Sequence, residues 1–230
     1  IGSLQGLEGS RPSRDIEIVP TLTATQNEST ESPGIDPLVR EDPDVEAGLT
    51  VRWGVTPDLT ANLAINPDFS QIEADVAQLD VNNRFTLFFP EKRPFFLEGA
   101  DYFTTPLNAV FTRTVADPDV GANITGKKGR NTFGLFAARD AVTNLLFPGL
   151  YSSDAESFEQ PNDAFVGRYS FGFENTSYLG GLVTLREGEG YHNYVAGIDG
   201  RWKFNDQHRV FFQHLESDTR YPTDIATEFE

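Results

Sequence analysis

The sequence predicts an all-β protein, an antiparallel up-and-down β-barrel of the transmembrane kind. Three observations lead to this prediction: apolar and polar residues alternate with a period of two, short and long connections alternate along the chain, and aromatic residues gather beside the short connections. Hydrophobic residues make up 38% of the 230 positions, which is modest for a globular core of this size. No stretch reaches the roughly 18 apolar residues of a transmembrane helix.

The period-two alternation is clearest between Val45 and Ile65. Apolar side chains recur at every second position on both sides of the segment Gly54–Asp58. Successive side chains of a strand point to opposite faces, so this pattern predicts a hairpin with one apolar face. The same reasoning predicts nine strands, at residues 14–25, 44–54, 58–66, 119–127, 132–139, 164–174, 178–186, 193–204 and 208–216.

The connections between these strands alternate strictly in length. Short turns at 55–57, 128–131, 175–177 and 205–207 separate the longer segments 26–43, 67–118, 140–163 and 187–192. Outer-membrane barrels have short periplasmic turns and longer extracellular loops. We therefore expect residues 1–13 to form a periplasmic lead-in and residues 14–230 to form a partial barrel. Nine strands are an odd number and an open edge cannot face lipid, so we expect the N-terminal portion of a larger barrel.

Aromatic residues flank the short turns. Trp53, Phe173, Trp202 and Phe204 end predicted strands, whereas Phe133 and Tyr178 begin them. Such a belt is typical of an interfacial girdle, although hydrophobic filling beside hairpin turns is the simpler alternative. Outward, lipid-facing side chains are expected at Val45, Ala47, Leu49, Val51, Trp53, Leu59, Leu63, Ile65, Phe171, Phe173, Ile198 and Trp202. Inward side chains are expected at Arg52, Arg168, Glu174, Asp199 and Arg201.

The charge and the rare residue types exclude several functions. A net charge of −17 repels phosphate backbones, which argues against nucleic-acid binding. The chain has no Cys and only three His, and it lacks the common hydrolase and nucleotide-binding motifs, so we expect no resident cofactor. The triplets 42–44 and 117–119 carry carboxylates that Ca²⁺ accepts, although such clusters are usually solvated. Whether any carboxylate pair is catalytic stays open.

Two phrases in the segment 66–118 resemble a known family. They read NPDFSQIEAD at 66–75 and FFPEKRPFFLEG at 88–99. They resemble a bacterial family of unknown function whose members usually carry an N-terminal module similar to family-nine carbohydrate-binding domains, followed by an outer-membrane β-barrel. That module is absent from this chain. The residues carrying the resemblance are Asn66, Pro67, Asp68, Phe69, Glu73, Asp75, Phe88, Phe89, Pro90, Glu91, Lys92, Arg93, Pro94, Phe95, Phe96, Glu98 and Gly99.

The second phrase also predicts a plug. Residues 85–98 contain seven large apolar side chains together with charges of both signs, a composition poorly suited to the lipid face. The segment 66–118 therefore either folds into the lumen or caps the barrel from outside; we expect residues 85–98 to pack against the inner wall. Arg93 should bind a carboxylate in a bidentate way. Partners are expected on the wall: Arg52, Arg168 and Arg201 for the acids, and Glu46, Glu174 and Asp199 for the bases.

The leading functional hypothesis is an outer-membrane channel or transport-related barrel. Its partners would be outer-membrane lipid and, through the resemblance, a saccharide. One alternative is a membrane-anchored carbohydrate-active hydrolase with its carboxylates in the lumen or loops. The other is a barrel that anchors or scaffolds a periplasmic carbohydrate-binding module without transporting a solute.

Overall fold

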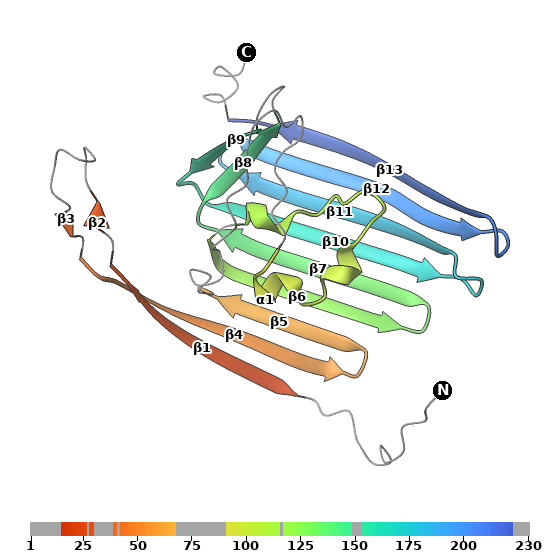
Figure 1. Ribbon diagram of the computed structural model, residues 1–230, viewed down its shortest axis with the longest axis horizontal. Coiled ribbons are helices and arrows are strands. Elements are labelled where there is room, and N and C mark those ends of the chain that lie inside the picture. Colours follow the sequence, from red (N-terminus) through yellow and green to blue (C-terminus); the bar gives the residue numbers. More distant parts are fainter. Residues whose placement is uncertain are drawn as a thin grey trace.

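A computed structural model describes residues 15–26, 28–29, 39–40, 42–67, 91–115, 117–148 and 153–222. Nearly all of the regular structure is β-strand, and nine strands form one antiparallel sheet (Figure 1). Their order is β1-β4-β5-β6-β7-β10-β11-β12-β13, so each strand of this sheet pairs with the strands of the sheet that precede and follow it in the sequence. The predicted all-β class and single meander are confirmed. No described helix is long and apolar enough to cross a membrane.

The bounds of the nine strands lie within four residues of the predicted ones, but the connection predicted to be long at 187–192 is a two-residue turn, 189–190. The strands are β1 Ile16–Thr25, β4 Asp44–Thr56, β5 Leu59–Ile65, β6 Pro118–Lys128, β7 Asn131–Asp140, β10 Asn162–Gly172, β11 Tyr178–Gly188, β12 Tyr191–Lys203 and β13 Arg209–Arg220. Two short pairs were not predicted: β2 Glu28–Ser29 with β3 Val39–Arg40, and β8 Thr143–Pro148 with β9 Ser153–Phe158. The remaining elements are the helix α1 Pro94–Leu97 and the 3-10 turns η1 Ala100–Phe103 and η2 Thr112–Thr114. The predicted lead-in, residues 1–13, lies outside the described residues.

The two faces of the sheet differ in composition. One face carries apolar side chains across all nine strands. Examples are Ile18, Leu63, Leu135 and Ile198, whose exposed fractions are 61%, 39%, 44% and 54%, and the partly exposed Val51. We call this side the exposed face. The opposite face, which we call the covered face, carries Arg52, Asn62, Asn123 and Arg168 among small residues.

Burial is inverted in one respect: many large apolar side chains of the strands are exposed, whereas polar side chains such as Asn123 and Arg168 on the covered face are buried. The larger buried apolar cluster lies on the covered face, where residues of the segment 91–115 pack on the sheet. Its buried members are Ala64, Phe95, Phe96, Val115, Phe136, Ala138, Val166 and Leu182. A second cluster places Leu145 of β8 against Tyr191 of β12. Figure 1 shows the segment crossing this face.

Register assigns the predicted outward and inward side chains to these two faces. All predicted outward residues within strands lie on the exposed face, and Phe173 packs against Trp202 with ring centroids 5.5 Å apart. Arg52, Arg168, Asp199 and Arg201 lie on the covered face. The prediction for Glu174 was wrong, because β10 ends at Gly172 and Glu174 lies in a turn, where it binds Arg130.

The aromatic belt also needs one correction. Trp53, Phe133 and Trp202 lie on the exposed face, as a girdle requires. Tyr178 instead pairs with Arg201 and lies on the covered face. Its place after a short turn could not reveal this, because one residue of register moves a side chain to the other face.

The strands are staggered across the sheet. The row of lateral partners that starts at Ile16, the first residue of β1, ends at Glu216, the eighth residue of β13. A closed barrel needs such a progressive offset, because its strands tilt relative to the barrel axis. In the described part of the chain the sheet is open, with β1 and β13 as its edges.

One ion pair joins β10 and β12 on the covered face, across the strand β11 that lies between them. Arg168 of β10 donates to both carboxylate oxygens of Asp199 on β12, at 2.5 and 2.8 Å, and the two side chains are 4% and 1% exposed. Gly180 of β11 lies beneath the guanidinium, where a Cβ would come within 2.6 Å of it. Because residue 180 of β11 is a glycine, the ion pair between β10 and β12 can pass over this strand.

Removing one partner of this pair should destabilise the sheet. Arg168→Met leaves the buried carboxylate of Asp199 without its cation, which typically costs about 3–5 kcal/mol. The free energy of unfolding, from urea titration in detergent, would measure the loss. The double variant Arg168→Met/Asp199→Leu should be more stable than the single one, and a single variant at least as stable as the double would contradict the assignment.

Candidate functional site

The chain turns onto the covered face directly after β5. Asn66 has a left-handed backbone conformation, φ 40°, and its side-chain amide donates to the carbonyl of Ala47 at 3.1 Å. Its own carbonyl oxygen passes over Gly48, where any Cβ would clash with it. Gly48 belongs to the covered face, opposite Thr21. Asn66, the first residue of the family phrases, thus packs its own backbone over the covered face at the end of β5.

The second phrase is described from Glu91 onward. Asp68, Phe69, Glu73, Asp75, Phe88, Phe89 and Pro90 lie outside the described residues, as do Phe85 and Leu87. Residues 91–115, which we call the docked segment, lie against the covered face. Of the predicted stretch 85–98, residues 91–98 therefore pack on one face of the sheet.

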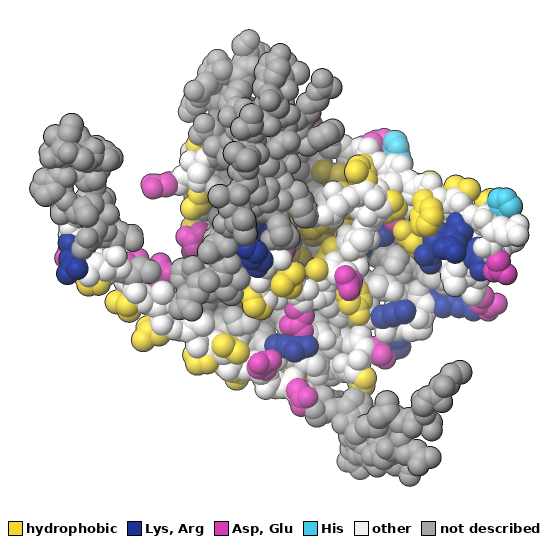
Figure 2. Space-filling view, viewed as in Figure 1, with side chains coloured by type: hydrophobic (Ala, Val, Ile, Leu, Met, Phe, Trp, Pro, Cys, Tyr) yellow, Lys and Arg dark blue, Asp and Glu magenta, His cyan; other side chains and the backbone are white. Residues whose placement is uncertain are grey.

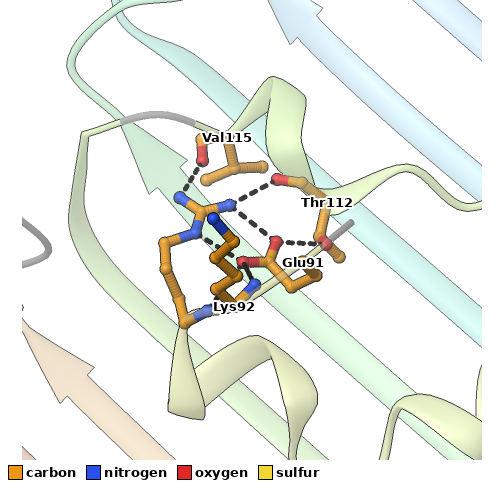
Figure 3. Close-up of polar contacts among 5 residues, drawn as sticks. Glu91, Lys92, Thr112 and Val115 are labelled. Atoms are coloured by element: carbon orange, nitrogen blue, oxygen red, sulfur yellow. Dashed lines mark hydrogen bonds and ion pairs between the residues drawn. The ribbon is translucent and has the colours of Figure 1, made fainter. Parts of the chain in front are cut away.

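The guanidinium of Arg93 makes most of the polar contacts within the docked segment. Figure 3 draws these contacts with Glu91, Thr112 and Val115 labelled. The Arg93 side chain is 1% exposed, and its Nε and one terminal nitrogen donate to the two carboxylate oxygens of Glu91, each at 2.8 Å. It also donates to the carbonyls of Val115 at 2.6 Å and Thr112 at 3.0 Å. The predicted bidentate contact is confirmed, but its partner is Glu91 of the same phrase rather than a wall carboxylate.

These contacts clamp the two ends of the docked segment together. Glu91 and Arg93 lie at its beginning, and Thr112 and Val115 lie at its end. The Thr112 hydroxyl donates to Glu91 at 2.6 Å, and the guanidinium lies 4.0 Å from the ring centroid of Phe96. Pro94 then begins α1, where a proline is favoured because the first helical N–H has no partner.

The clamp sets the protonation of Glu91. Burial raises the pKa of this carboxyl, but hydrogen bonds from Arg93 and Thr112 and the charge of Arg93 outweigh burial and hold its pKa below the ordinary value of 4.5. Glu91 is therefore ionised at neutral pH. The pair stabilises the docked segment above pH 4.5, and this contribution is lost as the pH falls through the lowered pKa.

Small residues of the sheet receive the aromatic rings of the segment. A Cβ at Gly121 of β6 would come within 2.9 Å of the Phe95 ring, and a Cβ at Gly134 of β7 within 2.9 Å of the Phe103 ring. Phe95 and Phe96 pack edge to face and both contact Phe136. The amide of Asn123 donates to the carbonyl of Phe95 at 3.2 Å, so the wall also binds the segment's backbone.

The last two residues of the phrase connect the segment to the lower-numbered strands. Glu98 pairs with Arg52 of β4 at 2.5 Å, which confirms Arg52 as a partner for an acid of the segment. Gly99 has φ 73° and lies against the side chain of Thr125, which a Cβ would meet at 2.8 Å. Glycine is required there by both conformation and space.

The segment reaches the other edge of the sheet as well. Gln213 of β13 accepts from the N–H of Leu107 at 2.5 Å and donates to its carbonyl at 3.2 Å. Arg186 of β11 donates to the carbonyl of Thr114 at 3.0 Å. Sequence reasoning missed these two residues, because an isolated Gln or Arg in a strand shows no signal for a partner about 70 to 100 residues away.

Two cavities lie between the docked segment and the wall. One of about 170 Å³ is lined by Phe96, Phe103, Phe111, Asn123 and Val166, among others. A wider groove of about 500 Å³ lies beside residues 108–115 and is lined by Thr184, Arg186, Tyr191, Asn193 and Thr219. No group of three or more His, Asp or Glu side chains in the described part of the chain could hold a metal ion.

Replacing the clamp residue should loosen the docked segment. Arg93→Lys keeps the charge but cannot reproduce the planar fork, so we expect the free energy of opening for residues 94–115 to fall by about 1.5–3 kcal/mol. Hydrogen exchange of the backbone amides would measure it. Asp101→Asn, at an exposed side chain of the same segment, serves as the control; equal exchange in both variants would contradict the clamp.

The pKa of Glu91 predicts an acid-induced release. Amide protection of residues 94–115 should stay constant from neutral pH down to pH 4.5 and fall below it, because protonation removes the charge that Arg93 binds. In Glu91→Gln the protection should be lower at neutral pH and should change less in acid. A release that is centred above pH 4.5, or that is identical in the variant, would exclude Glu91 as its cause.

Comparisons with known proteins place these features in one family. Residues 16–131, from the first residue of β1 to the first residue of β7, match the model of DUF5916, which is described as a domain of unknown function. The match covers half of the chain and includes the turn at Asn66, the clamp and the docked segment. Neither curated proteins nor solved structures gave a match. The chain belongs to the DUF5916 family.

Proposed function

We propose that this protein is an outer-membrane β-barrel whose covered face lines the lumen and whose exposed face contacts lipid. The inverted burial carries this proposal. Large apolar side chains such as Leu22, Ile124 and Trp202 are 77%, 40% and 45% exposed, whereas Asn123 and Arg168 on the other face are 3% and 5% exposed. Burying one such apolar side chain is worth roughly 1.5–3 kcal/mol, so a continuous face of them needs an apolar solvent.

Two further observations support a barrel. The strands form a meander with the progressive stagger that closure requires. The edges β1 and β13 have to be paired before the exposed face can enter lipid, because unpaired backbone groups are costly there. In outer-membrane barrels the longer connections lie outside the cell and the short turns in the periplasm. Three long connections, β1 to β4, β5 to β6 and β7 to β10, share one end of the sheet with the two-residue turn 189–190. We assign this end to the outside, so that β1 begins on the periplasmic side.

Within this barrel the docked segment acts as a constriction. It crosses the covered face from Arg52 on β4 to Gln213 on β13 and fills the space over β6 and β7 with Phe95, Phe96 and Phe103. The groove beside residues 108–115 stays open next to it. We therefore propose a channel or transport-related protein whose lumen the docked segment narrows. The family resemblance makes saccharides the first solutes to assay.

A barrel that only anchors a periplasmic module is the second candidate, and the dense filling of the covered face favours it. The hydrolase is favoured less. The carboxylates of Glu91, Glu98 and Asp199 each lie against an arginine guanidinium, whereas a glycosidase pair needs one acid held protonated.

Arginine scanning tests the membrane face. Leu49→Arg or Ile198→Arg should impair assembly into outer membranes, because Arg near the bilayer midplane costs about 2–4 kcal/mol. Thr50→Arg, one position from Leu49 on the covered face, is the matched control and should be tolerated better. Heat-modifiable migration of the membrane fraction would report assembly. Equal tolerance of the three variants would argue against lipid contact.

Conductance in planar bilayers separates the channel from the anchor. Deleting residues 85–98 should raise the single-channel conductance, because the deletion removes Phe95, Phe96 and the clamp. Arg93→Lys, which keeps the length of the chain, should raise the frequency of large openings. An assembled deletion variant with unchanged conductance, together with an unchanged Arg93→Lys, would mean that the segment does not restrict the lumen.

A further inference from the structure

Three cations gather on the covered face at the turn between β12 and β13. Lys203, the last residue of β12, lies directly opposite Arg209, the first residue of β13. Arg201 lies two positions earlier in β12 and therefore on the same face. Figure 2 shows Lys and Arg side chains gathered at this end of the strands. Like charges directly opposite one another destabilise an antiparallel pair, so the arrangement needs a compensating charge.

Nearby carboxylates supply only part of that charge. Lys203 donates to Asp206 at 2.6 Å, but this carboxylate is 96% exposed in the turn. Glu174, on the neighbouring turn, binds Arg130. Within the described ranges the side chain of Arg209 makes no hydrogen bond or ion pair, and its charge acts at longer range on the same Asp206. Three cations thus face one exposed carboxylate, in a chain whose net charge is −17.

Arg201 is already oriented for a ligand. Its Nε and one terminal nitrogen donate to the carbonyl of Thr176 at 2.9 and 2.5 Å, and its guanidinium lies 5.5 Å from the ring centroid of Tyr178. Neither the Thr176 carbonyl nor the Tyr178 ring carries a formal charge, so these contacts do not neutralise the positive charge of Arg201. Because the side chain is fixed before a ligand arrives, less conformational entropy is lost on binding.

We propose that Arg201, Lys203 and Arg209 form a binding site for an oxyanion, the phosphate or carboxylate group of a soluble ligand. The guanidinium of Arg209 offers planar, paired donors. The other terminal nitrogen of Arg201 adds a further donor and the ammonium of Lys203 a point charge, and together these groups suit a tetrahedral or planar oxyanion. The site lies on the covered face, whereas a lipid headgroup would approach along the exposed face beside Trp202 and Val210. If the chain forms the proposed barrel, this site lies at the β12–β13 turn, at the periplasmic entrance of the lumen, and favours the entry of anions there.

Calorimetric titration of the full chain in a zwitterionic detergent with inorganic pyrophosphate tests the site. Pyrophosphate should bind, and its affinity should fall with added salt. The double variant Lys203→Gln/Arg209→Gln should weaken binding by at least about tenfold, because it removes charge-assisted hydrogen bonds. Lys128→Gln, which removes a cation of the exposed face beside the β6–β7 turn, is the control and should bind like the wild type.

Wild-type protein that does not bind pyrophosphate, or a folded double variant that binds it equally well, would overturn the proposal. A second arm compares nanodiscs with and without phosphatidylglycerol. If the two cations affect binding of that lipid and not of pyrophosphate, the site serves headgroups and the soluble ligand is excluded. Neither arm depends on conductance. A protein that binds pyrophosphate but shows no channel activity would therefore contradict the proposed function and still support the anion site.

Discussion

The buried guanidinium of Arg93 is the constraint on which the covered face depends. A charge that is 1% exposed is tolerable only when its donors are satisfied, and here Glu91, Thr112 and Val115 satisfy them together. Those acceptors come from both ends of the docked segment. Satisfying the charge therefore closes the segment on itself, and the closed segment presents Phe95, Phe96 and Phe103 to the sheet.

The sheet is shaped to receive what the clamp presents. Gly121 and Gly134 leave room for the rings of Phe95 and Phe103, and Asn123 binds the backbone between them. In most sheet proteins the buried side is the apolar one. Here Phe95, Phe96 and Val115 of the docked segment share the buried cluster with strand residues such as Phe136 and Leu182, while the strands also present large apolar side chains on the other face. The exposed face carries large apolar side chains, and the covered face must accommodate the docked segment. The period-two pattern allows both, because alternate residues of each strand point to opposite faces.

Sequence reasoning recovered the features that local rules govern. Alternation around Leu49 and Ile198 located the strands and their faces, and the planar fork of Arg93 implied a bidentate carboxylate. It did not identify Glu91 as that carboxylate, because donor chemistry specifies the kind of partner and not its position. Glu174 and Tyr178 were misplaced because both lie where a strand ends or begins, and one residue of register there changes the face. Gln213 and Arg186 gave no signal because their partners are distant in the chain.

The contact between Gln213 and Leu107 carries a consequence for the order of folding. The tight hairpins β4–β5, β6–β7 and β11–β12 join strands that are close in sequence, so each can form as soon as its own residues are free to pair. Gln213 and Leu107 are separated by 106 positions, and their contact must wait until the last described strand is in place. The segment between β5 and β6 is synthesised before most of the sheet exists, yet its far attachment is completed near the end. Its phenylalanines pack on β6 and β7, which form early, so the aromatic end of the segment can dock well before the end that is held by β13.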